Sequence, residues 1–417
     1  MKKRRVVPNK NRLGDSSSVG PLTVTPRDFE DGTPSKVVVV GAGTRFLSAM
    51  SYYTIRLANA LGGRFDVVAI PMRQLLPTFM YPGRSRVGSM ATRLEYDPAV
   101  EVLDGVDWYW GPSLLRALNT LRRKSPEVVI FEWWTGTVLH SYLAIALVAK
   151  LLGAKIIVEF HEVLDTSEEN IPLARAYVRA LGRPFFRLAS GFVIHSDADR
   201  VPLEQRYQLR GRPCELVHHG PFDHHVSKQA SDQPLPAVHR EAPAGTLNLL
   251  YFGIIRPYKG VADLIEAFGL LDDDEAENYW LTIVGEIWEG WDLPAQQIAS
   301  HRHQKRITLV NRFVDDDEVA AYFAGADAVV LPYHRSSASG PAHIAMSAGL
   351  PLVITSVGGL PGAVAEYEGA ILVPPHDATA LRDAIRDLPK LCGQTYKDPH
   401  SWDRTVTRFA DLMKRLG

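Results

Sequence analysis

The chain has 417 residues, which is too many for one ordinary domain, so we expect two domains. Its 46 basic and 47 acidic side chains nearly cancel, which argues against a dedicated nucleic-acid-binding protein. The two cysteines, Cys214 and Cys392, lie far apart, which fits a reducing cytosol and offers neither a disulfide framework nor a metal site. The longest apolar run, residues 142–148, is far shorter than the about 20 residues that a membrane-spanning helix needs. We therefore expect a cytoplasmic protein without a nucleic-acid partner.

Residues 1–35 are polar and rich in Ser, Pro and Gly, which predicts a disordered basic tail. The first twelve residues hold six Lys or Arg and no acidic residue. Two interpretations stay open, a solubilising tail and a weak peripheral contact with anionic lipid, to which each basic residue near the surface would add about 1 kcal/mol. No apolar core follows the basic start, so the pattern does not predict a secretory signal.

From residue 36 onward, short apolar strands alternate with amphipathic helices, which predicts parallel sheets covered on both faces. We therefore predict an α/β protein with two Rossmann-like domains at residues 36–226 and 246–398, a linker at 227–245, and a closing helical segment at 399–417. The first domain has predicted strands at 37–40, 65–70, 128–131, 155–158 and 191–194 and helices at 51–62, 114–121, 139–152 and 173–188. The second has predicted strands at 247–252, 280–284, 307–310, 328–331, 352–354 and 370–373, and the last helix is predicted at 402–416.

The second series opens with a strand that reaches Gly253 and continues into a turn carrying Arg256, Pro257 and Lys259. Apolar residues at helical spacing follow directly, from Val261 onward. A helix start with two fixed cations beside it is a natural anion site. This segment therefore predicts that a diphosphate is held here.

A second candidate anion site follows the predicted strand at 328–331. Ser339, Gly340 and Pro341 precede or open a predicted helix, whose free N–H groups and neighbouring hydroxyls suit an anion. Pro341 fits the first helical turn because its missing N–H would be unsatisfied there anyway. The alternative is a Ser-rich helix cap that binds no ligand.

Candidate residues also follow two strands of the first series, at the sheet edge where such folds bind ligands. Gly41, Gly43 and Thr44 follow the first strand and indicate a loop whose backbone approaches a ligand, the alternative being an ordinary tight turn. His161 and Glu162 follow the strand at 155–159. Such a histidine can donate a hydrogen bond to a phosphate or sugar, or simply cap backbone groups.

Three further clusters suggest metals, and we assign none of them to a metal. The run at 218–225 holds four histidines, but neighbouring residues of an extended chain point to opposite faces and do not chelate one ion easily. We instead expect His219 and Gly220 to border the cleft at a domain junction. The acidic runs at 272–275 and 315–318 are read as structural, the second because Asp commonly caps a helix.

The chain resembles retaining glycosyltransferases of the GT-B fold, in the large family numbered four. The resemblance is strongest over residues 247–385 and extends by position over 36–225, including the first loop and His161. The closing helix that begins at Ser401-Trp402 is similar to one that crosses back to the N-terminal domain. Four stretches carry the resemblance: 253–260, 284–286, 328–353 and 357–361.

The resemblance implies that Arg256 and Lys259 neutralise the donor diphosphate and that His161 contacts the transferred sugar. It also implies that Gly340 and Pro341 offer backbone groups to the donor, in a site that includes Gly253, Glu286 and Ser339. Such enzymes use no metal or other cofactor, since the cations and a helix start take the leaving-group charge. The implied reaction moves a sugar from a nucleotide sugar to a hydroxyl of a saccharide, a lipid-linked acceptor or a small molecule, as in polysaccharide biosynthesis.

The chain departs from the family pattern at two positions. Members usually have two glutamates eight residues apart, and the aligned positions here are Ser336 and Ile344. The loop looks like the Ser/Gly-rich version that some members carry. Two alternatives follow: a nucleotide-sugar 2-epimerase of the same fold, with Glu162 and Glu286 as its candidate carboxylates, or a non-catalytic sugar-nucleotide-binding protein.

Overall fold

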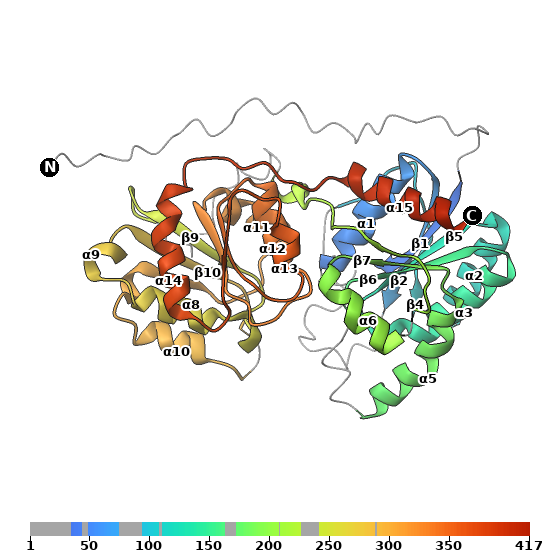
Figure 1. The fold of residues 1–417 in the computed structure, drawn as a ribbon, viewed down its shortest axis with the longest axis horizontal. Coiled ribbons are helices and arrows are strands. Elements are labelled where there is room, and N and C mark those ends of the chain that lie inside the picture. Colours follow the sequence, from blue (N-terminus) through green and yellow to red (C-terminus); the bar gives the residue numbers. More distant parts are fainter. Residues whose placement is uncertain are drawn as a thin grey trace. The chain divides into compact units, whose positions relative to one another are not determined.

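The computed structural model describes residues 35–43, 49–74, 94–107, 111–162, 172–207, 209–226, 242–287 and 290–417. These residues form two compact units, one ending at Gly220 and including His400–Gly417, the other spanning Pro221–Pro399. Each unit holds one parallel sheet with helices on its faces, so the predicted α/β fold class is confirmed (Figure 1). The expectations for the basic tail, Thr44 and most of the linker concern residues outside these ranges.

The first unit has an eight-stranded sheet in the order β3-β2-β1-β5-β6-β7-β8, with β4 also paired to β2. The five predicted strands of this unit are present. The strands β3, β4 and β8 are additional, and their two or three residues are too short to carry a periodic signal. The bounds are β1 (Lys36–Ala42), β2 (Asp66–Gln74), β3 (Glu101–Val102), β4 (Val106–Asp107), β5 (Val128–Trp133), β6 (Lys155–Phe160), β7 (Gly191–Ile194) and β8 (Cys214–Leu216).

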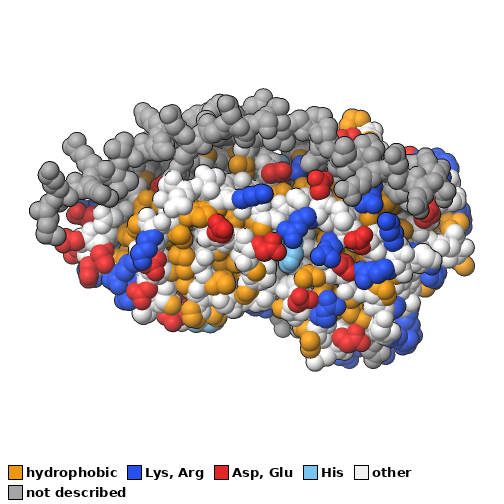
Figure 2. All heavy atoms as spheres, turned by 45° about the horizontal axis from the view of Figure 1, so that its top comes forward, with side chains coloured by type: hydrophobic (Ala, Val, Ile, Leu, Met, Phe, Trp, Pro, Cys, Tyr) orange, Lys and Arg blue, Asp and Glu red, His pale blue; other side chains and the backbone are white. Residues whose placement is uncertain are grey.

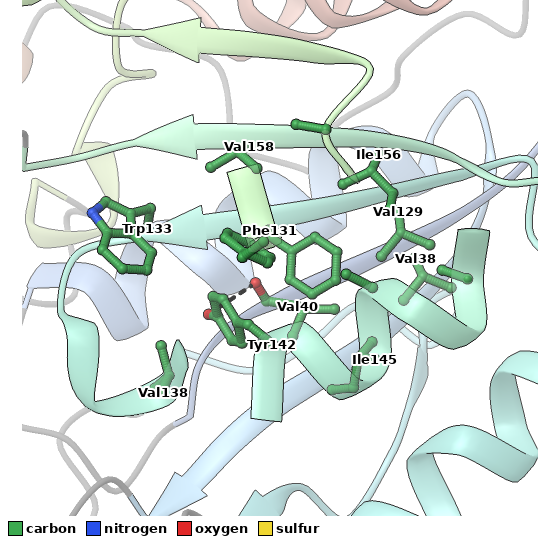
Figure 3. Close-up of a cluster of buried hydrophobic side chains, with 14 of the residues drawn as sticks. Val38, Val40, Val129, Phe131, Trp133, Val138, Tyr142, Ile145, Ile156 and Val158 are labelled. Carbon is green, nitrogen blue, oxygen red and sulfur yellow. Dashed lines mark hydrogen bonds between the residues drawn. The ribbon is translucent and has the colours of Figure 1, made fainter. Parts of the chain in front are cut away.

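Apolar side chains on both faces of this sheet pack against helices. On one face, Phe131 lies against Phe185, and the Tyr142 hydroxyl donates to the Val40 carbonyl at 3.3 Å (Figure 3). On the other face, Phe409 of the last helix belongs to the same buried cluster as Leu57 of α1. The two helices lie side by side (Figure 1). The helices are α1 (Ala49–Gly62), α2 (Pro112–Lys124), η3 (Gly136–Val138), α3 (Leu139–Leu151), α5 (Pro172–Leu188), η4 (Asp197–Asp199), α6 (Arg200–Tyr207) and α15 (Trp402–Leu416).

The second unit has a six-stranded sheet in the order β11-β10-β9-β12-β13-β14. All six strands were predicted. The strands are β9 (Leu247–Phe252), β10 (Tyr279–Val284), β11 (Ile307–Val310), β12 (Ala328–Leu331), β13 (Leu352–Thr355) and β14 (Ala370–Val373). The helices are η5 (Asp223–His225), η6 (Pro257–Lys259), α8 (Val261–Gly269), α9 (Asp273–Ala276), α10 (Leu293–Ala299), η7 (Gln304–Arg306), α11 (Asp316–Ala324), α12 (Gly340–Ser347), α13 (Leu360–Val364), α14 (Ala378–Asp387) and η8 (Leu388–Lys390).

The surface carries charges of both signs. Acidic and basic side chains are interspersed over the visible face of the described residues, in keeping with the net charge of −1 (Figure 2). The Asp315 side chain accepts a hydrogen bond from the Glu318 N–H at 3.1 Å, which confirms its predicted role as a helix cap. Within the described ranges, every helix is too short or too polar to cross a bilayer.

Candidate functional site

The turn after β9 is held tightly against the segment after β12. Gly260 adopts a left-handed conformation with φ 67°, and a Cβ atom there would lie 1.8 Å from the Pro332 carbonyl oxygen. The His334 N–H donates to the Tyr258 carbonyl at 2.8 Å. Only glycine fits this close approach, so the turn that presents Arg256 and Lys259 is fixed by backbone packing.

A cation and a helix start meet at this turn. The Lys259 ammonium lies 3.7 Å from the centre of the buried Tyr333 ring, and the Tyr333 hydroxyl lies 3.3 Å from Ser339 Oγ. Ser339 caps α12 by accepting from the Ala342 N–H at 3.2 Å. Pro341 stands in the first turn of that helix, as predicted.

The glycines of the neighbouring loops complete this grouping. A Cβ atom on Gly253 would lie 3.8 Å from Pro341, and one on Gly285 would lie 1.9 Å from the Gly253 carbonyl oxygen. The partly buried Glu286 accepts through its backbone carbonyl from the Ile255 N–H at 2.9 Å. The structure thus gathers, within one unit, these predicted donor-site residues: Gly253, Lys259, Glu286, Ser339, Gly340 and Pro341. Arg256, also partly buried, stands at the N-cap of η6 in the same turn.

We call Arg256 and the six residues gathered above the donor cluster. The cluster lies where the strand order of the second sheet reverses, between β9 and β12. Open parallel sheets bind ligands at the carboxyl ends of the strands beside such a point. The N-terminus of α12 adds unsatisfied N–H groups, and Lys259 and Arg256 add positive charge. The arrangement is therefore suited to an anion such as a diphosphate.

The two positions that depart from the family pattern have local roles. The Ser336 hydroxyl donates to the Ala338 carbonyl at 2.7 Å, and its own carbonyl accepts from the Gly359 N–H at 3.3 Å. Ile344 is buried in α12. Ser336 shapes the loop before α12, whereas Ile344 contributes to the core and offers no polar group.

Three buried histidines meet in the first unit, at the carboxyl ends of neighbouring strands. His161 follows β6, His195 follows β7, and His219 lies three residues beyond β8. Their ring centres are 4.6 Å apart for His161 and His195, 5.3 Å for His161 and His219, and 3.9 Å for His195 and His219. The Tyr53 ring stands edge-on to His161 at 4.6 Å and to His219 at 4.7 Å. We call this group the histidine cluster.

Sequence reasoning singled out His161 and His219 but missed His195 and Tyr53. His195 could have been found, because it follows a predicted strand just as His161 does. Tyr53 carried no such signal, since it reads as one apolar position of a helix.

Two buried carboxylates, also missed, lie beneath the histidine cluster. Glu132 on β5 and Glu159 on β6 face each other in register. The Thr54 hydroxyl donates to Glu132 and the Tyr53 hydroxyl donates to Glu159, each at 2.5 Å. Burial raises the pKa of both carboxyl groups, that of Glu159 to about 8. A Glu within an apolar strand was the available sequence signal.

The glycines after β1 serve close packing. A Cβ atom on Gly41 would lie 2.3 Å from Glu132 Oε2, and one on Gly43 would lie 2.6 Å from the Met72 carbonyl oxygen. The Gly43 N–H donates to that carbonyl at 3.0 Å. Glu162 is exposed at the end of the described segment that holds His161.

The histidine run at 218–225 is divided between the two units. His219 turns into the histidine cluster, whereas the His218 ring lies 5.4 Å from that of His400. His224 and His225 belong to the second unit, with ring centres 4.0 Å apart. A separate group of Asp263, His334 and His376 lies in the second unit, with His334 Nε2 at 2.8 Å from Asp263 Oδ2.

Known proteins resemble this chain in sequence and fold. Residues 246–390 match the family model described as glycosyl transferases group 1. The D-inositol 3-phosphate glycosyltransferase of Arthrobacter sp. is 29% identical over 198 residues, which cover 45% of this chain and 45% of that protein. The chain thus aligns with about half the length of this curated relative.

Two solved structures share the fold over nearly the whole chain. Sucrose-phosphate synthase from Thermosynechococcus elongatus has a TM-score of 0.57 at 17% identity, covering 92% of this chain and 94% of that one. Anabaena HepE in complex with UDP has a TM-score of 0.57 at 14% identity, with the same coverage of 92% and 94%. At such identities the likeness concerns the fold alone.

Proposed function

We propose that the chain transfers a sugar from a nucleotide diphosphate sugar to a hydroxyl acceptor. The premise is that the chain has the GT-B glycosyltransferase fold and that residues 246–390 match the glycosyl transferases group 1 family. The observation that carries the proposal is the donor cluster at the reversal of strand order in the second sheet. It lies within the residues that match the family. UDP is the first nucleotide to test, because the related fold of HepE was solved with UDP.

In the proposed reaction, the bond between the anomeric carbon and the diphosphate oxygen breaks while the acceptor oxygen bonds to that carbon. The acceptor proton passes to the departing diphosphate oxygen, so the products are a glycoside and a nucleoside diphosphate. Arg256, Lys259 and the start of α12 stabilise the negative charge that develops on this oxygen. Attack from the face that the diphosphate leaves makes the reaction retaining.

His161 is proposed to donate a hydrogen bond to the transferred sugar. Both of its ring nitrogens are buried without a hydrogen-bond partner among the described residues. A buried polar group in that state is stabilised when a ligand supplies the missing partner. Burial also lowers the pKa of His161, so the imidazole is neutral and has one N–H to donate.

The donor proposal is tested by calorimetric titration of the full chain with UDP, GDP, ADP and TDP and their sugars. We expect one nucleotide to bind, and Arg256→Ala or Lys259→Ala to weaken its binding by about tenfold or more, the loss of about 1.4 kcal/mol or more from a charged hydrogen bond. Lys390→Ala removes an exposed lysine of the same unit that pairs with Asp387, and it should leave binding unchanged. Binding of no nucleotide, or equal losses in all three variants, would reject the proposal.

Stereochemistry and product separate the proposed transferase from an epimerase. Proton NMR of the reaction with the selected donor should show a glycoside with the anomeric configuration of the donor, and release of the free nucleoside diphosphate. Hydroxyl acceptors to be supplied include inositol phosphates, hexose phosphates and lipid-linked sugars. An inverted product would reject retention, and a donor inverted at C2 without any transfer would identify an epimerase instead.

We also propose that the first unit contacts an anionic membrane surface. Three adjoining helices, α2, α3 and α5, hold nine Lys or Arg and no Asp or Glu. Arg175, Arg179, Arg183 and Arg187 recur every four residues along α5, all exposed and without a carboxylate partner in the described ranges. Exposed leucines accompany them, with Leu151 86% and Leu173 81% exposed. Basic residues with interspersed leucines suit a lipid surface better than a nucleic acid.

Flotation with vesicles tests this contact. The full chain should bind vesicles that contain phosphatidylserine or phosphatidylglycerol and not vesicles of phosphatidylcholine alone. Reversing Arg175, Arg179 and Arg183 to Glu should abolish binding, whereas reversing the exposed Lys305, Lys390 and Lys414 should preserve it. Equal binding by both triple variants would reject this surface and leave the N-terminal tail as the contact.

A further inference from the structure

The histidine cluster contains an unbalanced pair of acceptors. His195 Nδ1 lies 2.6 Å from the Val217 carbonyl oxygen, which can only accept, so Nδ1 carries the proton. In the neutral ring, Nε2 then holds a lone pair. Nε2 lies 3.4 Å from Glu159 Oε1, and that oxygen already accepts from the Tyr53 hydroxyl. Two acceptors that face each other at this distance are bridged either by the proton of a neutral Glu159 or by a cation.

The other members of the histidine cluster direct nitrogen atoms to the same place. Ligand atoms of His161, His195 and His219 all lie within 4.8 Å of one another. His161 Nε2 also lies 3.9 Å from the second oxygen of Glu159. All three side chains are buried. Neutral imidazoles are the form that binds metal ions.

We propose that His161, His195 and His219 bind a first-row transition-metal dication, with Zn²⁺ the best match, and that Glu159 balances its charge. Three imidazoles exclude Mg²⁺ and Ca²⁺, which prefer oxygen ligands, and suit a tetrahedral site with one open position. The hydrogen bond from His195 to the Val217 carbonyl is the outer-shell partner that fixes a metal-binding tautomer. The sequence analysis assigned no metal because it weighed histidines that are adjacent in the chain. These three histidines instead follow three different strands.

A consequence follows that rests on the proposed function. The ring nitrogen of His161 that binds the ion cannot donate a hydrogen bond to the transferred sugar. The ion would therefore compete with the sugar and inhibit transfer reversibly. It would leave the binding of the free nucleoside diphosphate unchanged, because Arg256 and Lys259 belong to the other unit.

Cobalt substitution gives a direct test on untagged full-length protein. Titration with Co²⁺ should produce the visible absorption of a tetrahedral site with one ion per chain, and Zn²⁺ should displace it. His195→Asn keeps a donor for the Val217 carbonyl and removes the Nε2 ligand, so we expect it to weaken Co²⁺ and Zn²⁺ binding by about 100-fold. His376→Asn is the matched control, because it removes a histidine from the second group of metal-ligating side chains.

Each outcome decides the proposal. Loss of the absorption in His195→Asn, with retention in His376→Asn, supports the site, provided that both variants unfold at the wild-type temperature. A His195→Asn variant that unfolds early is replaced by His219→Gln, for which the same loss is expected. The proposal is overturned if the wild-type chain binds no Co²⁺ or Zn²⁺ at micromolar metal, or if only His376→Asn loses the absorption. Because no donor is present, these results stand even where nucleotide binding fails.

Discussion

The Lys259 ammonium lies 3.7 Å from the centre of the Tyr333 ring, so a buried aromatic face fixes one of the two cations of the donor cluster. A cation over an aromatic ring gains roughly 1 kcal/mol. Tyr333→Leu should therefore weaken nucleotide binding by about fivefold. Tyr333→Phe keeps the ring and should bind almost as the wild type, measured by calorimetry with the selected nucleotide. Equal effects of the two changes would point to the hydroxyl contact with Ser339 instead.

Two serine caps separate helix stability from donor binding. Ser339 caps α12 and Ser401 caps α15, each accepting a backbone N–H at 3.2 Å. Replacing either serine with Ala should lower the free energy of unfolding of its unit by about 1 kcal/mol. Only Ser339→Ala should weaken nucleotide binding, because only α12 starts at the donor cluster. A loss of affinity in Ser401→Ala would show that general destabilisation explains the effect.

Gly260 and Gly290 distinguish steric overlap from backbone strain. Both adopt positive φ, 67° and 79°. A Cβ atom on Gly260 would lie 1.8 Å from the Pro332 carbonyl oxygen, whereas one on Gly290 would meet no atom of the described residues within 4 Å. Gly290→Ala should lower the free energy of unfolding by about 1 kcal/mol, because alanine is strained in the left-handed conformation. Gly260→Ala should cost several times more and displace the turn that holds Lys259. Equal losses in the free energy of unfolding of the two variants, measured by urea unfolding, would contradict this expectation.

Asp199 predicts a pH dependence of stability. Burial raises its pKa from 3.8 to about 6, so between these values the folded protein keeps a proton that the unfolded chain has released. The free energy of unfolding of the wild type therefore falls as pH rises through this window. Asp199→Asn cannot ionise, so its melting temperature relative to wild type should rise from about pH 4 to about pH 7. A constant difference across that range would contradict the shift.

The local chemistry of the candidate site was largely predictable. The turn from Gly253 to Gly260 precedes an amphipathic helix, and Pro341 occupies the first turn of α12, as predicted. Ser339 caps this helix, which the sequence analysis gave as an alternative to its role in an anion site. Each of these features depends on residues within one turn or strand of each other. By contrast, nothing in the sequence indicated that Lys259 would lie over Tyr333, which is 74 positions later, since β9 and β12 become neighbours only in the folded sheet.

The sequence by itself determined the longer strands and the amphipathic helices, because hydrophobic periodicity, turn residues and caps act between near neighbours in the chain. It also placed His161 at a strand end. Only the tertiary structure decided that His161, His195 and His219 share one cluster above Glu132 and Glu159. That grouping depends on the strand order β5-β6-β7-β8, which is set by the packing of a whole sheet between its helices and by no local stretch of sequence.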